Sequence, residues 1–282
     1  MKTGGFCVYI EYPVILARIG FERQIFMHRE SKSLKSLKWY KALATAKGRE
    51  SSGAFLVEGD RAIRQIITGH PDSIVEVLAA GELAPVYNDY PARTLTESQF
   101  KSICLTKTPQ GPLAVVRLPD DVESGRIPID AGDRVLLLED IQDPGNVGSL
   151  IRTAAAFGYS GVVMSDKCAD PFSPKCVQST AGAILSPWIR RTASYLSIIV
   201  SLKSRGYSLV ATVLTGEDTL SVVPKSGRIV LALGNEADGL SMPVIELSNY
   251  RCKIPIHEES IESLNVAACG AVCMYITSSK TR

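Results

Sequence analysis

The sequence predicts an α/β protein in two parts: a larger C-terminal part, a mostly parallel sheet with helices on both faces, and a smaller N-terminal α/β part. Three observations predict this class. Strand-length apolar runs alternate with helical stretches from residue 134 onward. Some runs have a continuous apolar centre, as in "RVLLLEDI", which is typical of parallel strands buried on both faces. Residues 119–133 are rich in Pro, Gly and Asp and indicate a linker between the parts.

The N-terminal part, residues 28–118, is expected to begin with a helix over residues 31–48 that ends at Gly48. Leu34, Leu37 and Leu43 mark its apolar side. Four segments should follow this helix and lead to the closing strand 111–119: strand 53–59, helix 60–69, strand 73–80 and helix 96–104, whose Thr-x-x-Gln start suits a capping box.

The C-terminal part, residues 134–282, should alternate strands and helices. Strands are expected at 134–141, 161–165, 207–214, 228–234 and 250–256. Helices are expected at 146–158, 173–184, 194–206 and 263–276. Because the carboxyl ends of parallel strands share one edge of a sheet, ligands should bind there.

Composition narrows the class of protein. The 282 residues are 45% hydrophobic and 21% charged, with a formal charge of +2, and no apolar run reaches the length of a membrane span. Seven cysteines without a C-x-x-C pair, and three scattered histidines, give a zinc site little support. The odd cysteine count indicates reduced thiols and a cytoplasmic location. Residues 1–27 are apolar but interrupted by charges and Pro13, so we expect an extra segment before a natural start at Met27.

The stretch "DPGNVGSLIRTAAAFGY", residues 143–159, joins a tight turn to a helix. Asn146 stands where a helix N-cap is expected, so capping is one interpretation. Arg152 follows six residues later, and a surface salt bridge is its plainest role. The stretch lacks both the Lys-Ser/Thr ending of a P-loop and the Gly-x-Gly of a dinucleotide fold.

Two later stretches also carry polar groups at expected ligand edges. In "LALGNEADGLS" a strand runs into Gly234, followed by Glu236, and glycines there let a ligand approach the backbone. In "IPIHEESIESLNVAACGAVCMYI" an apolar helix with small residues is preceded by Ser263 and Asn265. Capping explains one of these two polar residues, but not both.

In order, these stretches resemble the three motifs of the SpoU (TrmH) family of RNA ribose 2'-O-methyltransferases, in the SPOUT superfamily. "PFSPKCVQSTAGAI" resembles the family segment between the first two motifs. "GAFLVEGDRAIRQII" and "LTKTPQGPLAVV" resemble its N-terminal RNA-binding domain, which is akin to a ribosomal-protein fold. That domain favours ribosomal over transfer RNA.

The resemblance implies S-adenosylmethionine as cofactor, a trefoil knot, and a homodimer with the active site at its interface. It implies a cofactor pocket lined by Gly234, Ile254 and Leu264. It makes Arg152 the central catalytic residue, either as general base or as a clamp for phosphate and developing charge. The residues that would position Arg152 and the ribose are Asn146, Glu236, Ser263 and Asn265. Two positions depart from the family pattern: Gln178, where arginine is usual, and His257, in a turn that usually contains glycine.

A run of lysines indicates an RNA contact near the N-terminus. Lys32, Lys35, Lys38 and Lys41 recur every third residue around Trp39 and Tyr40, which suits phosphates and unstacked bases. A solvated helix face with a core tryptophan is the alternative.

Two other functions stay open at this point. A non-catalytic RNA-binding protein could have the same fold. A nucleotide-dependent enzyme of the ordinary Rossmann type is disfavoured, because Gly-x-Gly-x-x-Gly is missing.

Overall fold

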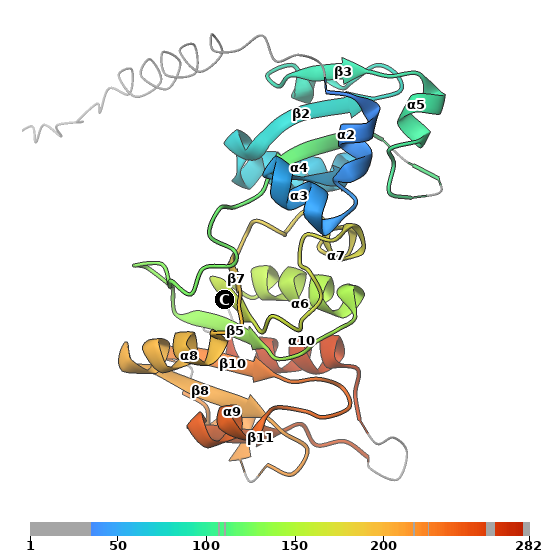
Figure 1. Cartoon of the computed structure of the whole chain (residues 1–282). Helices are drawn as coiled ribbons and strands as arrows, with labels where there is room; N and C mark the ends of the chain where they lie inside the picture. The colour runs from blue at the N-terminus through green and yellow to red at the C-terminus, as the bar shows by residue number, and fades with distance from the viewer. Residues whose placement is uncertain are drawn as a thin grey trace, which may run out of the picture. The chain divides into compact units, whose positions relative to one another are not determined.

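The computed structural model describes residues 35–106, 108–109, 111–216, 218–224, 226–257 and 263–278. The proposed extra segment 1–27 and Lys32 lie outside these residues. The described chain forms a four-stranded and a seven-stranded sheet (Figure 1). No helix among the described residues combines the length and apolarity that crossing a membrane requires.

The four-stranded sheet has the order β1-β4-β2-β3, with β4 antiparallel to both of its neighbours and β3 parallel to β2. Its strands are β1 (Ala54–Glu58), β2 (Ile74–Ala79), β3 (Ala92–Thr94) and β4 (Leu113–Arg117). Its helices are α2 (Leu37–Ala42), α3 (Ala46–Ser52), α4 (Asp60–Gly69) and α5 (Glu97–Lys101), with short 3₁₀ turns at Pro71–Ser73 and Pro85–Tyr87. The predicted capping box is present, because Thr96 and Gln99 satisfy each other's backbone N–H groups.

The single helix predicted over residues 31–48 is wrong within its described part. The chain breaks after α2, and Thr45 caps a second helix, α3, by accepting a hydrogen bond from Gly48 N. Gly48 is therefore a buried residue inside α3, and Gly53, with φ 58°, ends that helix instead.

The seven-stranded sheet is parallel throughout and has the order β7-β6-β5-β10-β8-β11-β9. Its strands are β5 (Arg134–Leu138), β6 (Gly161–Met164), β7 (Trp188–Arg191), β8 (Tyr207–Thr212), β9 (Asp218–Thr219), β10 (Arg228–Leu233) and β11 (Tyr250–Lys253). Its helices are α6 (Pro144–Ala156), α7 (Pro174–Ser179), α8 (Tyr195–Ser204), α9 (Met242–Leu247) and α10 (Val266–Thr277), with a 3₁₀ turn at Leu220–Val222. The strands β7 and β9 and the helix α9 were not predicted.

Helices cover both faces of the large sheet, as expected from its doubly apolar strands. Successive residues of β5 point to opposite faces: Leu136 and Leu138 pack in the cluster with α6 and α10, and Val135 and Leu137 pack with α8 and α9. The helices α6 and α10 pack against each other (Figure 1). Gly270 allows this, since a Cβ there would lie 2.3 Å from Leu150 Cδ2. The predicted fold class is confirmed.

The order of strands indicates where the large sheet should bind a ligand. The chain runs from β5 outward to β6 and β7, continues at β8 on the other side, and returns to insert β10 between β5 and β8. Strand order therefore reverses beside β5 and β10, whose carboxyl ends, Leu138 and Leu233, are paired in register. Open parallel sheets bind ligands at such a point.

Candidate active site

The helix α6 begins directly after β5, and its cap is Asp143 rather than Asn146. The Oδ1 of Asp143 accepts the backbone N–H of Asn146 over 2.9 Å, and Pro144 occupies the first helical position. Lys175 Nζ lies 2.7 Å from Asp143 Oδ2, and this hydrogen bond, followed by that from Asn146 N, lowers the pKa of Asp143. The capping interpretation of Asn146 is wrong, and its side chain is available for other contacts.

Asn146 bridges the other two motifs. Its Nδ2 donates to Glu236 Oε1 over 2.6 Å, and its Oδ1 accepts from Asn265 Nδ2 over 3.1 Å. Asn265 caps α10, because its Oδ1 accepts the backbone N–H groups of Ala267 and Ala268 at 2.9 and 3.3 Å. We call Asn146, Glu236 and Asn265 the amide–carboxylate cluster. It combines residues from three distant stretches of sequence.

The direction of each hydrogen bond in the cluster follows from the helix end. Only an oxygen can accept the two N–H groups of α10, so the Nδ2 of Asn265 must point to Asn146. Asn146 then presents oxygen to Asn265 and nitrogen to Glu236, whose carboxylate is an acceptor. The hydrogen bonds therefore all run in one direction, from the N–H groups of α10 through Asn265 and Asn146 to Glu236, and we call this chain of hydrogen bonds the relay.

Glu236 lies in a closed loop over residues 234–241. The backbones of Asn235 and Gly239 exchange two hydrogen bonds, and Asn235 Oδ1 accepts Ala237 N over 2.8 Å. A Cβ on Gly234 would lie 2.2 Å from the carbonyl carbon of Gly239. Gly234 therefore lets the loop close on itself. The sequence analysis explained Gly234 by the close approach of a ligand and did not predict this packing requirement.

The three predicted cofactor residues each lie directly after a strand or just before a helix. Gly234 follows β10, Ile254 follows β11 and is half-buried, and Leu264 precedes α10 and is 36% exposed. The strand β8 lies between β10 and β11, so the loop 213–216 after β8 shares the carboxyl edge of the sheet with Gly234 and Ile254. Its Leu214 is 74% exposed. The sequence did not point to this loop, because only the order of strands brings it here.

Arg152 and Ser263 do not join the cluster. Arg152 is exposed on α6, and within the described residues its side chain forms no hydrogen bond or ion pair. The surface salt bridge that was the alternative role for Arg152 is therefore absent from the described part of the chain. Ser263 is likewise exposed and forms no hydrogen bond with any described residue. Gln178, on α7, and His257 are also exposed.

The predicted RNA-binding lysines are exposed where they are described. Lys38 and Lys41 are neighbours on α2, and Lys35 precedes that helix. Tyr40 is fully buried, and the Trp39 ring meets it edge-on at 5.2 Å, with Trp39 packed against the same core. Tyr40 therefore cannot stack on a base, and the packing of the partly buried Trp39 against the core agrees with the alternative of a core tryptophan.

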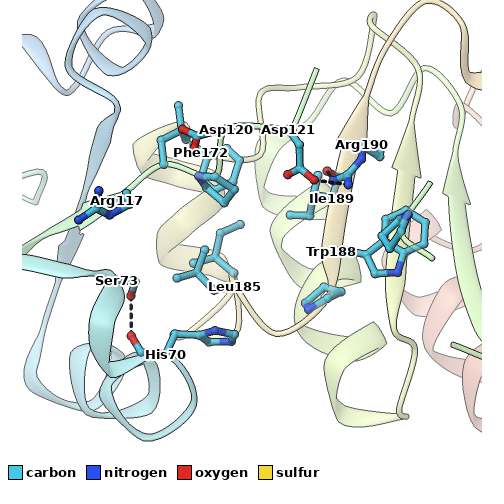
Figure 2. Close-up of a pocket in the computed structure, with 15 residues that line it drawn as sticks. His70, Ser73, Arg117, Asp120, Asp121, Phe172, Leu185, Trp188, Ile189 and Arg190 are labelled. Carbon is cyan, nitrogen blue, oxygen red and sulfur yellow. Dashed lines mark hydrogen bonds and ion pairs between the residues drawn. The ribbon is translucent and has the colours of Figure 1, made fainter. Parts of the chain in front are cut away.

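A cavity of about 390 Å³ lies away from the cluster (Figure 2). None of the predicted site residues lines it. On one wall the guanidinium of Arg190 is bound to Asp121 and to the backbone carbonyls of Arg126 and Ile189. Trp188 Nε1 donates to Ala131 O over 3.2 Å. These bonds fasten the segment 119–133 to the edge strand β7, so this wall has a structural role.

Comparison with known proteins decides the family. The model of the SpoU rRNA Methylase family matches residues 133–275, and that of the MRM3-like substrate binding domain matches residues 35–114. The chain belongs to the SpoU rRNA methylase family. Over 250 residues it is 30% identical to the 23S rRNA (guanosine(2553)-2'-O)-methyltransferase RlmP of Bacillus subtilis. The matched region covers 87% of this chain and 97% of that relative. A 23S rRNA (uridine(2479)-2'-O)-methyltransferase of Streptomyces viridochromogenes is 28% identical over 258 residues, 87% of this chain and 89% of that one.

Solved SpoU structures have the same architecture. The SpoU methyltransferase AviRb of S. viridochromogenes, in complex with the cofactor AdoMet, matches with a TM-score of 0.74 and 26% identity over 89% of this chain and 97% of that one. An AdoMet-bound rRNA methyltransferase from Sinorhizobium meliloti matches with a TM-score of 0.73 and 25% identity over 86% and 93%. The predicted family, RNA 2'-O-ribose methyltransferase activity and cofactor S-adenosylmethionine are confirmed.

Proposed function

We propose that this SpoU protein methylates a ribose 2'-hydroxyl of ribosomal RNA at the amide–carboxylate cluster. The observation that carries the proposal is the direct hydrogen bonding of Asn146, Glu236 and Asn265 at the reversal point of a parallel sheet. Two relatives that match most of this chain are named for 2'-O-methylation of 23S rRNA, which supports ribosomal over transfer RNA.

The carboxyl edge of the sheet suits S-adenosylmethionine, whose sulfonium supplies an electrophilic methyl group when bound. Backbone groups at Gly234, Ile254 and Leu264 would hold the cofactor. The exposed side chains of Leu264 and Leu214 offer apolar surface for the adenine, which an apolar pocket with a few polar groups binds best.

The cluster would orient the ribose. The Oε2 of Glu236 forms no hydrogen bond with a described residue, so it can accept from a ribose hydroxyl. Ser263, two residues before Asn265, would add a second hydroxyl contact. Holding the hydroxyl in line with the methyl donor can lower the barrier by roughly 7–11 kcal/mol in well-oriented cases.

Arg152 would act on the RNA rather than on the cluster, since its guanidinium has no partner among the described residues. A guanidinium carries five N–H donors and no acceptor, which makes it a poor base. We therefore assign it the grip on a phosphate and the stabilisation of charge on the attacking oxygen.

The remaining assignments belong to the same proposal. Residues 28–118 would bind RNA through Lys35, Lys38 and Lys41, and residues 134–282 would form the knotted catalytic domain. A homodimer would cover the apolar surface of α10, where Val272 is 40% and Tyr275 63% exposed. A cytoplasmic location stays a prediction, in keeping with the six free cysteines among the described residues.

Titration calorimetry with S-adenosylmethionine tests the location of the cofactor. Wild type should bind saturably, and Gly234→Val should not, because the new side chain collides with residues 239 and 240. Gly69→Ala is the matched control, since no atom lies within 4 Å of a Cβ at Gly69. Wild-type affinity in Gly234→Val would refute this location. No binding to wild type, with or without RNA, would favour the non-catalytic RNA-binding alternative.

A further inference from the structure

Glu139 is a buried acid at the carboxyl end of β5 that the proposed mechanism does not use. Its side chain is 3% exposed, and within the described residues no lysine or arginine pairs with it. Its carboxylate accepts three hydrogen bonds: from Ser241 N over 2.7 Å, from Ser241 Oγ over 2.6 Å, and from the hydroxyl of Tyr195. Burial, and then the bond to Glu139, raise the pKa of Tyr195, which keeps this hydroxyl a donor. Burying a carboxylate is costly, and an unpaired one needs such hydrogen bonds to be tolerated.

These bonds tie down the end of the loop 234–241. Ser241 is its last residue and precedes α9, yet its hydroxyl does not cap that helix. The hydroxyl and the backbone N–H of Ser241 both point to Glu139 instead.

The next residue of the chain, Asp140, holds the beginning of the same loop. The Nδ2 of Asn235 donates to the carbonyl oxygen of Asp140 over 2.8 Å. Asp140 has φ 58°, in the left-handed region that non-glycine residues rarely adopt. Ser165 fixes it there, because the Ser165 hydroxyl accepts from Asp140 N over 2.9 Å and donates to its Oδ1 over 2.6 Å. Two consecutive residues therefore anchor both ends of the loop.

We propose that Glu139 is a positioning residue for S-adenosylmethionine binding, acting through Ser241. Its carboxylate holds the loop 234–241 in the closed shape that presents Gly234 to the cofactor and Glu236 to Asn146. The proposal rests on the proposed location of the cofactor at this loop.

The two hydroxyls that share Glu139 Oε1 provide a matched pair of variants. Ser241 lies on the loop and Tyr195 lies on α8, so Ser241→Ala and Tyr195→Phe each remove one hydroxyl from the same oxygen. A purely structural role for Glu139 predicts similar losses of thermal stability and no change in cofactor affinity for either. A positioning role predicts that only the loop variant weakens binding.

The experiment measures the Kd and KM of S-adenosylmethionine for the full chain, together with thermal unfolding. Ser241→Ala and Glu139→Gln should raise Kd and KM about tenfold, the effect of losing one hydrogen bond to a charged acceptor. Ser241→Thr, which keeps the hydroxyl, should restore the affinity. Tyr195→Phe should keep Kd within about twofold of wild type and should leave kcat at saturating cofactor unchanged.

Gly234→Val serves as the reference that separates the two proposals. If it loses cofactor binding while Ser241→Ala and Glu139→Gln bind like wild type, the positioning role is refuted and the cofactor location stands. If Tyr195→Phe weakens binding as much as Ser241→Ala, the role is general structural support. If Gly234→Val binds normally, the cofactor location fails, and the positioning role fails with it.

Discussion

Asn146 and Glu236 are 90 residues apart in the sequence, and the Nδ2 of the first donates to the Oε1 of the second over 2.6 Å. The bond joins the helix after β5 to the loop after β10, two neighbouring strands whose carboxyl ends meet. Asn265 completes the relay from the N-terminus of α10. The geometry of Glu236 therefore depends on groups in all three motifs, and each group can be changed separately.

Asn265 has two functions that substitutions can separate. Asn265→Asp keeps the oxygen that caps α10 but cannot donate a hydrogen bond to Asn146. The Asn146 amide then lies between two carboxylates, that of Glu236 and the new one. Whichever way the amide is turned, one of the two carboxylates faces its oxygen and receives no hydrogen bond. Stability should stay near that of wild type, because Asp and Asn are equally good caps, and kcat/KM for methyl transfer should fall about 10²-fold.

Asn265→Ala is the companion variant. It should lose similar activity and also about 1 kcal/mol of unfolding free energy, measured by urea denaturation, because the cap is removed. Full activity in Asn265→Asp would show that the relay does not position the site.

Arg152 can be tested without disturbing the fold, since it is exposed and has no partner among the described residues. Arg152→Lys keeps the charge but loses the planar fork that grips phosphate. Turnover should fall by roughly 10²-fold or more, while the melting temperature and the affinity for S-adenosylmethionine stay as in wild type. Near-normal turnover in Arg152→Lys would contradict both the clamp and the general base.

Lys38 and Lys41 should contribute to RNA affinity by neutralising phosphates. Replacing both with alanine should weaken the binding of ribosomal RNA. It should also reduce the slope of log K against log salt by about 0.7–0.9 for each phosphate that is no longer neutralised. Lys101→Ala is the control, since this exposed lysine pairs with Glu97 on α5. Equal salt slopes in the double variant, the control and wild type would place the RNA elsewhere.

Asp143 should make stability depend on pH at the start of α6. Its folded pKa lies below the usual value because of Lys175 and the N–H of Asn146, so its contribution is present above about pH 4 and is lost as the pH falls through the folded value. Asp143→Asn keeps the cap and loses the charge. Urea denaturation should show that wild type has a higher unfolding free energy than Asp143→Asn, by a constant difference around neutral pH. This difference should disappear in acid and become smaller in high salt. A difference independent of pH would rule out this charge effect.

Much of the fold follows from the alternation of apolar runs, but its boundaries and order depend on packing. The edge strand β7, "WIRR", was missed because half of its residues are charged. One long N-terminal helix was predicted in place of α2 and α3, because Thr45 was not recognised as the N-cap of a separate helix. Nothing in the sequence shows that β10 inserts between β5 and β8, an arrangement produced only by long-range pairing.

The site was predictable where a residue type had one plausible use. Capping was expected of one of Ser263 and Asn265, and Asn265 is the residue that caps α10. The Asp-Pro pair at 143–144 could have shown that α6 begins there, which frees Asn146. Glu139 gave no signal, because it was predicted as part of the strand 134–141 and nothing in the sequence shows that its carboxylate is buried.

The most direct test of the central claim is methyl transfer from labelled S-adenosylmethionine to large-subunit ribosomal RNA, followed by nuclease digestion and mass spectrometry of the nucleosides. Wild type should yield a 2'-O-methylated nucleoside, and Asn146→Ala should yield almost none while keeping its fold. A methyl group on a base, or equal product from Asn146→Ala, would contradict the account.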